Sequence, residues 1–383
     1  MRLLHLHSGN LFGGVETMLL TIARGGRRTG RFEHEFALAF DGRLAAELRA
    51  AGAPVYHLGE VRARNPMSVR RARRGLAELL AGRRYDAAVC HMAWAQALFG
   101  AGARRAGIAE IFWMHDAAAG RHWVERWAAL SPPDLAICNS RYTAETLGQI
   151  FPRTPSQVLH YPVAPAPARL SAAARTAMRA ELKTAPDAIV IIQTSRMESW
   201  KGHRMHLEAL ARLADLPGWV CWQAGGAQRP RERQYLTSLE RMARELGISD
   251  RVKFLGQRDD VARLLGAADI HCQPNAGAEP FGIVFIEALG AGLPVVSVAL
   301  GGALEIIDES CGILVAPGAT AALATALRRL ILDGAERARL GAAGPARAAQ
   351  LCDTATQMAR LEATIVGLTG GAEQADRVGE ARV

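Results

Sequence analysis

The chain has 383 residues, of which 50% are hydrophobic and 22% are charged, so it can form two domains that each bury a core, and a disordered or fibrous protein is excluded. The formal net charge of +9 lies entirely in residues 1–170, which hold 22 arginines and no lysine against 13 acidic residues. This half is expected to meet an anionic partner, such as a membrane surface, an acidic acceptor or nucleic acid, unless the asymmetry is only compositional drift.

The sequence also bears on cellular location. Its longest uncharged stretch, residues 288–304, is interrupted by glycines and a proline, so it does not read as a membrane span. The N-terminal segment MRLLHLHSGN has too short an apolar run for a secretory signal. We therefore expect a cytoplasmic protein, with peripheral attachment to the inner face of the membrane as an open alternative.

Metal and disulfide chemistry are not predicted. The six cysteines lie far apart, form no CxxC pair and mostly sit in apolar, strand-like runs, which is typical of buried free thiols. Neither an HExxH pair nor an Asp-x-Asp motif occurs in the sequence. We therefore expect no metal and no other cofactor.

Short apolar runs alternate with longer helical patterns, which is typical of βα units and parallel sheets. In the first half, strands are predicted at residues 2–7, 34–40, 54–58, 86–91, 110–115, 134–138 and 156–160. In the second half, they are predicted at residues 188–194, 218–224, 251–255, 269–273, 294–299 and 311–315. The simplest α/β arrangement is two Rossmann-like domains that face each other across a cleft.

A proline-containing segment separates the two halves. Residues 161–170 include Pro162, Pro165 and Pro167, which cannot continue a helix, so this segment is predicted to be a linker. We therefore assign residues 1–165 to an N-terminal domain and residues 166–351 to a C-terminal domain. Residues 369–383 are predicted to be a disordered tail.

Polar side chains close several predicted strands of the first half. His7, His91, His115 and His160 each end a strand, and Asn139 follows another. Because ligands bind outside the carboxyl ends of parallel strands, these groups are expected to converge on one rim. A single histidine at such a position is most often structural, whereas four on one edge favour a binding cleft.

The segment EPFGIVFIE carries two carboxylates, Glu279 and Glu287. Pro280 and Gly282 predict a turn that leads into a helix, with Glu279 in the loop and Glu287 inside the helix. Carboxylates accept hydrogen bonds from the paired hydroxyls of sugars, and the start of the helix favours a phosphate. Spacing alone favours the alternative, a capped helix that carries one exposed and one partly buried glutamate and has no ligand.

Two cations follow the predicted strand 188–194, in the segment RMESWKGH. Arg196 offers a planar fork to phosphate oxygens, and Lys201 offers a point charge. Two fixed cations at a strand end would stabilise a departing diphosphate. The alternative is a pair of solvated surface charges.

A third segment, HSGNLFGGVE, joins the first strand to a helix predicted at about residues 15–25. Gly13 and Gly14 allow close approach of the backbone to a phosphate or a donor sugar at the start of that helix. Glycine-rich βα turns are common, so this signal is weak. It does not match the dinucleotide fingerprint, which argues against an NAD or FAD enzyme.

Taken together, these segments and their order resemble the family-four retaining glycosyltransferases, which have the two-domain GT-B fold and an EX7E motif. The matching segments cover nearly the whole chain: GGVE, HD at residues 115–116, CNS, RMESWKG, AGG, RVKFLGQRDDV, AADIHCQPN, EPFGIVFIEALGAGLPVV, GGALE and GILV. Two segments depart from the family pattern. LHYPVAPAP stands where most members have a hinge that contains asparagine and glycine. AGGAQ stands where most members have an acidic GDG or GEG segment.

The resemblance implies a metal-independent hexosyltransferase that uses a UDP- or GDP-linked sugar and binds it in the C-terminal domain. Arg196 and Lys201 are expected to hold the donor diphosphate, and Glu287 the nucleotide ribose. Arg258 is expected to lie beside the base. The C-terminal helix, at residues 352–368, is expected to cross back onto the N-terminal domain.

The resemblance also assigns the contacts to the transferred sugar. Glu279 is expected to hold this sugar together with the backbone around Phe281, Gly282 and Ile283, and His115 is expected to contact it from the other domain. Gly13 and Gly14 would close over the phosphates or the acceptor. The remaining acceptor-side candidates are His7, Glu16, His91 and Asn139. The acceptor stays open, with cell-envelope polysaccharide or glycolipid synthesis the expected context.

Two other functions compete with this interpretation. A sugar-nucleotide epimerase on the same fold would change its substrate without an acceptor. A nucleic-acid-binding protein would use the basic half, but the arginines there alternate with alanine and leucine instead of stacking aromatics, and no recognition motif is present.

One basic helix is predicted near residues 67–82. Val69, Ala72, Leu76, Leu79 and Leu80 fall on one face of it, and three arginines, Arg70, Arg71 and Arg74, fall on the other. This helix is either an ordinary solvated surface helix or the place where the N-terminal domain rests on an anionic membrane.

Overall fold

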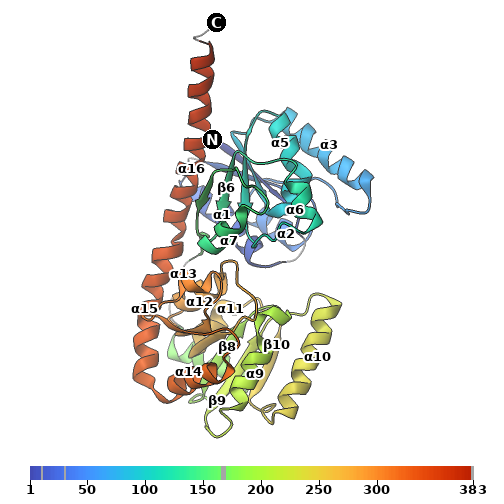
Figure 1. Cartoon of the computed structure of the whole chain (residues 1–383). Coiled ribbons are helices and arrows are strands. Elements are labelled where there is room, and N and C mark those ends of the chain that lie inside the picture. Colours follow the sequence, from blue (N-terminus) through green and yellow to red (C-terminus); the bar gives the residue numbers. More distant parts are fainter. Residues whose placement is uncertain (10–11, 30–31, 165–169, 381–383) are drawn as a thin grey trace. The chain divides into compact units, whose positions relative to one another are not determined.

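The computed structural model describes residues 1–9, 12–29, 32–164 and 170–380, and the chain divides into two compact α/β units (Figure 1). Unit 1 comprises residues Met1–Ala164 and Thr354–Val383, and unit 2 comprises Pro165–Asp353. The predicted boundaries lie within two residues of these limits. Most of the predicted linker, residues 165–169, lies outside the described part of the chain.

Unit 1 is built on a seven-stranded parallel sheet with the order β3-β2-β1-β4-β5-β6-β7. The strands are β1 (Arg2–His7), β2 (Glu33–Leu38), β3 (Val55–His57), β4 (Ala87–His91), β5 (Ala109–Met114), β6 (Leu135–Cys138) and β7 (Ser156–Val158). All seven strands predicted for this half are present. One face of the sheet presents Leu4, Leu6, Ala88 and Cys90 to an apolar cluster beneath α3 and its neighbours. Because side chains alternate along a strand, His5 and His91 point to the other face.

The helices of unit 1 connect these strands. They are α1 (Gly14–Thr29), α2 (Arg43–Ala50), α3 (Pro66–Gly82), α4 (Met92–Ala95), the π-helix η1 (Gln96–Gly100), α5 (Ala101–Arg105), α6 (Trp123–Ala128), α7 (Arg141–Leu147) and α16 (Thr354–Glu380). Helix α3 begins where its residue types predict, because Pro66 stands at the start and the Asn65 side chain caps it by accepting from the backbone N–H of Met67 at 3.1 Å.

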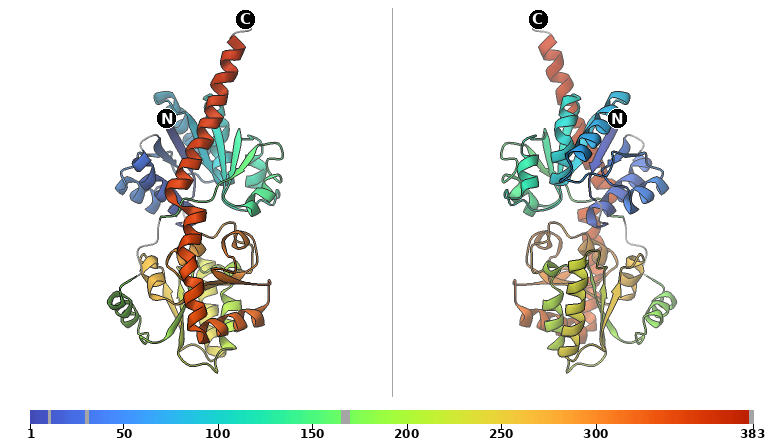
Figure 2. Two further views of the ribbon diagram at one scale, coloured as in Figure 1. Left: turned by 90° about the vertical axis from the view of Figure 1, so that its left-hand side faces the viewer. Right: turned by 90° about the vertical axis from the view of Figure 1, so that its right-hand side faces the viewer.

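Helix α16 returns the C-terminus of the chain to unit 1, as Figure 2 shows. The Thr354 hydroxyl donates to the Val163 carbonyl at 2.8 Å, and α16 packs on α1. Its buried residues Met358, Leu361 and Ile365 recur at helical spacing. The structure differs from the predicted disordered tail: α16 continues to Glu380 because residues 372–380 are rich in Ala, Glu, Gln and Arg, which favour helix.

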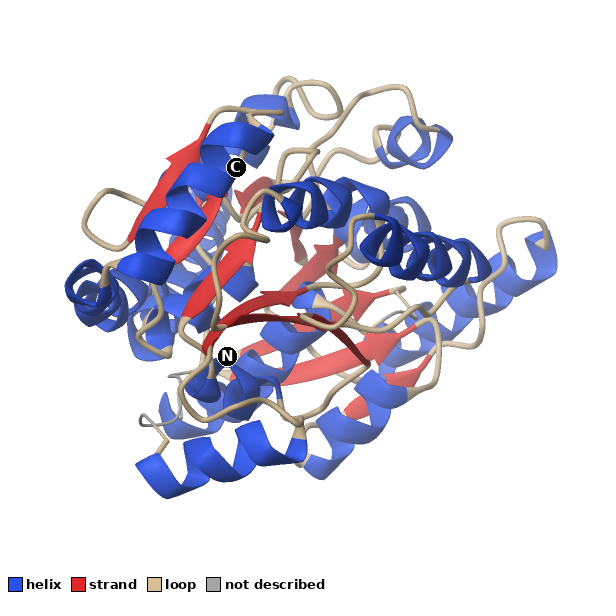
Figure 3. Ribbon diagram, turned by 90° about the horizontal axis from the view of Figure 1, so that it is seen from below, coloured by secondary structure: helices blue, strands red, loops and turns tan. Residues whose placement is uncertain are grey.

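Unit 2 has a six-stranded parallel sheet with the order β10-β9-β8-β11-β12-β13, and all six strands predicted for this half are present. The strands are β8 (Ile189–Thr194), β9 (Trp219–Ala224), β10 (Val252–Gly256), β11 (Ile270–Gln273), β12 (Val295–Val298) and β13 (Gly312–Val315). The helices are α8 (Ala172–Glu181), the 3-10 turn η2 (Ser199–Lys201), α9 (His203–Ala211), α10 (Pro230–Glu245), α11 (Val261–Ala267), α12 (Ile283–Gly290), α13 (Ala303–Ile306), α14 (Thr320–Leu332) and α15 (Gly334–Cys352). Within each unit, helices flank the strands (Figure 3).

Both units therefore have the doubly wound form that the alternating pattern predicts, and together they make the GT-B type of fold. All six cysteines are buried and free, as their apolar surroundings predict. Across the described residues, no helix combines the length and the apolar character that a membrane crossing requires.

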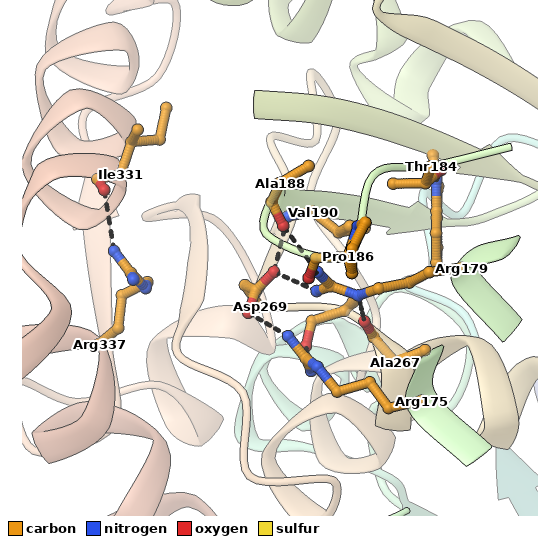
Figure 4. A network of polar contacts seen from close by, with 12 residues as sticks. Arg175, Arg179, Thr184, Pro186, Ala188, Val190, Ala267, Asp269, Ile331 and Arg337 are labelled. Carbon is orange, nitrogen blue, oxygen red and sulfur yellow. Dashed lines mark hydrogen bonds and ion pairs between the residues drawn. The ribbon is translucent and has the colours of Figure 1, made fainter. Parts of the chain in front are cut away.

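Asp269, which precedes β11, ties α8 to the sheet of unit 2 (Figure 4). Its carboxylate accepts from Arg175 and Arg179 at 2.6 Å each and from the backbone N–H of Val190 at 2.7 Å. Arg179 is 2% exposed. Its guanidinium also donates to three carbonyl oxygens, those of Pro186, Ala188 and Ala267. This buried cation therefore depends on Asp269 for its countercharge.

Replacing Asp269 with Ala should lower the free energy of unfolding by about 3 kcal/mol, because it leaves the buried Arg179 charge unpaired. The matched control is Asp215→Ala, which removes the partner of Arg328 in an ion pair whose aspartate is 62% exposed, and which should cost less than about 1 kcal/mol. Thermal unfolding of the full chain measures both variants. An equal decrease in the free energy of unfolding of both variants would show that the hydrogen bonds of Asp269 are not the main interaction that holds α8 on the sheet.

Candidate active site

Two predicted site residues of unit 2, Lys201 and Glu279, form a buried ion pair. The Lys201 Nζ lies 2.7 Å from the Glu279 Oε2, and both side chains are about one-tenth exposed. Asn275 donates to the same oxygen at 2.8 Å. Every hydrogen bond to this carboxylate reaches Oε2, so among the described residues nothing donates to Oε1. An ionised carboxylate can accept at both oxygens, and Oε1 is therefore available to a hydroxyl donor.

The backbone around Lys201 is held by close contact with the loop after β11. Gly202 has φ of 74°, and a Cβ at this position would lie 1.7 Å from the Pro274 carbonyl oxygen, so no other residue fits. From β8, the Gln193 side chain donates to the Lys201 carbonyl at 2.8 Å. His206 in turn contacts Gln193 at 2.8 Å. This chain of contacts fixes Lys201 next to the strand ends.

Glu279 lies in the loop that leads into α12, as predicted. Its carbonyl accepts from the Gly302 N–H at 2.7 Å, which holds this loop against the start of α13. Gly282, the residue before α12, has φ of 106°, a region that glycine tolerates best. Phe281 and Ile283 have buried side chains, which leaves their backbone as the part predicted to contact a ligand.

Glu287 lies in the second turn of α12 and is separate from the Lys201–Glu279 pair. Its carboxylate has no hydrogen-bond partner among the described residues. Burial of the carboxyl raises its pKa to about 7. Glu287 is partly buried, so its carboxylate has lost part of its hydration, and a hydroxyl pair that donates to it would replace those lost hydrogen bonds.

The two other predicted cations of unit 2 have carboxylate partners of their own. The Arg196 Nη2 lies 2.9 Å from Glu198, and Nη1 lies 3.6 Å from Glu232. That buried Nη1 donates no hydrogen bond within the described chain. The Arg258 guanidinium donates to Asp260 and Glu181, and these carboxylates raise its pKa. The structure thus does not bring Arg196 or Arg258 into contact with the Lys201–Glu279 pair.

Unit 1 has its own polar rim at the carboxyl end of its sheet. His7 lies 3.0 Å from Glu16, and the other Glu16 oxygen accepts from the Gly13 N–H at 2.9 Å. Glu16 therefore closes the first turn of α1 on the end of β1. Gly13 and Gly14 stand at the start of this helix as predicted. Asn10 and Leu11, from the same predicted segment, lie outside the described residues.

His115, His91 and Asn139 belong to one buried array in unit 1. His91 Nδ1 lies 2.9 Å from His115 Nε2, and His115 Nδ1 lies 2.6 Å from the Tyr161 hydroxyl. Asn139 donates to that hydroxyl at 2.9 Å. Both ring nitrogens of His115 are therefore engaged inside unit 1. His160, also predicted at this rim, is half-buried, and its neighbour Tyr161 belongs to the array.

The sequence interpretation missed several residues of these two sites. Gln193, Gln273 and Asn275 hold the Lys201–Glu279 pair, and the signal was available, because each is a polar residue at or just beyond the end of an apolar strand. In unit 1 it missed Tyr161, because that residue falls in the predicted linker. Across the described chain, no group of three or more His, Cys, Asp or Glu residues is arranged to hold a metal ion.

Comparisons with known proteins agree with this architecture. Residues 174–347 match the family described as glycosyl transferases group 1, and residues 12–167 match Glycosyltransferase Family 4. The chain is 34% identical over 167 residues to the lipopolysaccharide core biosynthesis glycosyltransferase LpsE of Rhizobium meliloti, a match that covers 43% of this chain and 46% of the relative. It is 44% identical over 101 residues to the phosphatidyl-myo-inositol mannosyltransferase of Mycobacterium leprae, which covers 26% of this chain and 27% of the relative.

The matched segments thus span less than half the length of these curated relatives. A solved structure extends the likeness to the whole chain. The structure of Anabaena HepE in complex with UDP is 25% identical, with a TM-score of 0.84, and the match covers 96% of this chain and 100% of that chain.

Glu287 should make the stability of the protein depend on pH. Because its pKa in the folded protein lies above the usual 4.5, the folded state binds an extra proton between about pH 4.5 and 7, and stability falls as pH rises through that range. Glu287→Gln should remove this contribution, which changes the free energy of unfolding by at most about 1.4 kcal/mol per pH unit. Denaturation at several pH values measures it, with the exposed Glu245→Gln as the control. Parallel pH profiles for wild type and Glu287→Gln would contradict the buried, raised-pKa carboxyl.

Proposed function

Because the chain belongs to family 4 of the glycosyltransferases, we propose that it is a retaining hexosyltransferase that moves a sugar from a UDP- or GDP-linked donor to an acceptor. The observation that carries this proposal is the buried Lys201–Glu279 pair beside the start of α12. An ammonium group has three N–H donors, of which Glu279 uses one, so Lys201 retains donors for a diphosphate. The UDP in the HepE structure supports a nucleoside-diphosphate donor.

The donor is assigned to unit 2 by the chemistry of its side chains. Lys201 and Arg196 take the diphosphate, whose negative charge grows as the sugar leaves, and fixed cations stabilise that charge. The free Oε1 of Glu279 accepts from a hydroxyl of the transferred sugar. Glu287 accepts from the ribose hydroxyls, and Arg258 lies beside the base.

The acceptor side is assigned to unit 1. His115 is the residue of unit 1 that we assign to the transferred sugar, although His91 and Tyr161 engage both of its ring nitrogens in this structure. Gly13 and Gly14 are assigned to the phosphates or the acceptor. The rim residues His7, Glu16, His91 and Asn139 shape the acceptor side. The names of the lipopolysaccharide and phosphatidylinositol glycosyltransferase relatives support a cell-envelope polysaccharide or glycolipid as the product.

We also propose that transfer needs no metal ion, because Lys201 and Arg196 supply the positive charge that a divalent cation would otherwise bring to the diphosphate. Activity should then persist in excess EDTA. Its complete loss, restored by added Mg²⁺ or Mn²⁺, would contradict this assignment of the two cations.

Lys201→Ala and Arg196→Ala should each lower kcat by about 2 kcal/mol of transition-state stabilisation or more, that is, roughly 30-fold. Release of nucleoside diphosphate from a panel of UDP- and GDP-sugars, with lipid-linked and polysaccharide acceptors, measures the rate. The control is Arg241→Ala on the surface of α10, which should leave kcat unchanged. Near-normal turnover in both site variants, with unchanged melting temperatures, would refute the diphosphate assignment.

We further propose that unit 1 attaches to an anionic membrane surface through α3. As predicted, Ala72 and Leu76 of this helix are buried, Val69, Leu79 and Leu80 pack against the same core, and three arginines are exposed. Arg73 donates to the carbonyls of Leu98 and Ala97 and stacks over Trp127 of α6, a helix that exposes Trp123. The exposed Trp123 stacks on Trp127, and an exposed tryptophan near a basic helix suits a membrane interface. A cytoplasmic location with peripheral attachment follows from this proposal.

The full chain should sediment with liposomes that contain acidic lipid at low salt, and high salt should release it, because each exposed arginine of α3 contributes about 1 kcal/mol of screened attraction. The triple variant Arg70/Arg71/Arg74→Glu should abolish sedimentation of the full chain. The matched control reverses three exposed arginines of α10, Arg233/Arg241/Arg244→Glu, and should still sediment. Absence of binding by wild type, or equal loss in both triple variants, would exclude α3 as the attachment site.

A further inference from the structure

Four histidines of unit 1 form a single hydrogen-bonded row. His34 Nδ1 lies 2.9 Å from His5 Nε2, His5 Nδ1 lies 2.9 Å from His91 Nε2, and His91 Nδ1 lies 2.9 Å from His115 Nε2. Successive rings also stack at centroid distances of 5.2 Å. Beyond His115 the row continues to the Tyr161 hydroxyl, to which Asn139 donates. The proposed function uses only the residues at the His115 end.

The register of the sheet explains why the rings meet. Leu3 of β1 pairs with His34 of β2, and His5 lies two residues beyond Leu3. Val89 of β4 pairs with His5, and His91 lies two residues beyond Val89. Trp113 of β5 pairs with His91, and His115 again lies two residues further on. Each step therefore moves one strand across and two residues toward the carboxyl edge, which keeps all four rings on one face.

All four rings are neutral, because burial lowers the pKa of each, that of His34 to about 4. A neutral imidazole has one N–H donor and one acceptor nitrogen. Where a ring donates through Nε2, the next ring must accept through Nδ1 and donate through its own Nε2. The whole row therefore carries its protons either on Nε2 throughout or on Nδ1 throughout.

We propose that His34, His5 and His91 are positioning residues, which together fix the tautomer and orientation of His115 and of the Tyr161 hydroxyl at the carboxyl edge of unit 1. That His115 takes part in sugar transfer rests on the proposed function, whereas the coupling of the four tautomers does not. Hydrogen bonds in such a row polarise one another in a low-dielectric interior, so the row acts as one unit. A set of merely buried histidines would instead choose their tautomers independently.

The tautomers are measured directly by imidazole ¹⁵N NMR of the histidine-labelled full-length protein near pH 7.5. We expect His5, His34, His91 and His115 all to carry the proton on the same ring nitrogen. Any mixture of Nδ1–H and Nε2–H forms among the four would overturn the proposal. This measurement needs no variant, and its outcome does not depend on whether the protein transfers a sugar.

The positioning role is tested by replacing His5. Of the residues that the proposed function assigns, His5 forms a hydrogen bond only to His91. His5→Phe keeps a ring to stack on Phe36 but removes both nitrogens. His5→Gln offers an amide that accepts at one atom and donates at the other, so it can restore the hydrogen bonds to His34 and His91. The matched control is His57→Phe, at an exposed position at the end of β3.

His5→Phe should change the His115 ¹⁵N shifts and lower kcat between about 10- and 100-fold with little change in the donor KM, since misplacement of a contacting group slows transfer. His5→Gln should restore both, and His57→Phe should alter neither. Unchanged His115 shifts in His5→Phe, or equal loss of kcat in the Phe and Gln variants, would overturn the proposal. If the wild type transfers no sugar at all, the proposed function fails. The NMR result still decides whether the tautomers of the four histidines are coupled.

Discussion

The buried ion pair between Lys201 and Glu279 is the interaction on which the candidate active site depends. Removing two charges from water is expensive, and the cost is offset only where good geometry and further hydrogen bonds accompany the pair. Here Asn275 supplies such a bond, and the backbone contact at Gly202 brings the lysine loop against the loop after β11. The pair leaves donors on the ammonium for phosphate oxygens and one carboxylate oxygen that can accept from a hydroxyl, and the proposed function rests on this combination.

Unit 1 meets a similar cost in a different way. One set of its buried polar groups is a row of four histidines, in which each ring forms a hydrogen bond to its neighbour on the adjacent strand. This arrangement exists only because the strands are parallel and in a register that advances two residues at each step. The row crosses the sheet of unit 1 and reaches its carboxyl edge only at His115, whereas in unit 2 the polar residues gather at the carboxyl edge itself.

Much of this could be predicted from the sequence, because apolar runs and helical spacing are local properties. They located all thirteen strands, the amphipathic α3, and the loop and helix that carry Glu279 and Glu287. Pairing between strands is not a local property, so the sequence did not predict the row through His5 and His34. Tyr161 was missed because it was assigned to a linker. Nor could spacing show that Arg258 faces Asp260 and Glu181, or that α16 continues to Glu380.

We propose that the Lys201–Glu279 pair forms part of a nucleoside-diphosphate site. The most direct measurement is the melting temperature of the wild type and of Lys201→Ala in the presence of UDP and GDP, because a ligand that binds only the folded state raises it. At least one of these nucleotides should raise the melting temperature of the wild type, and this shift should be lost in Lys201→Ala. No shift with either nucleotide, or an equal shift in both proteins, would contradict it.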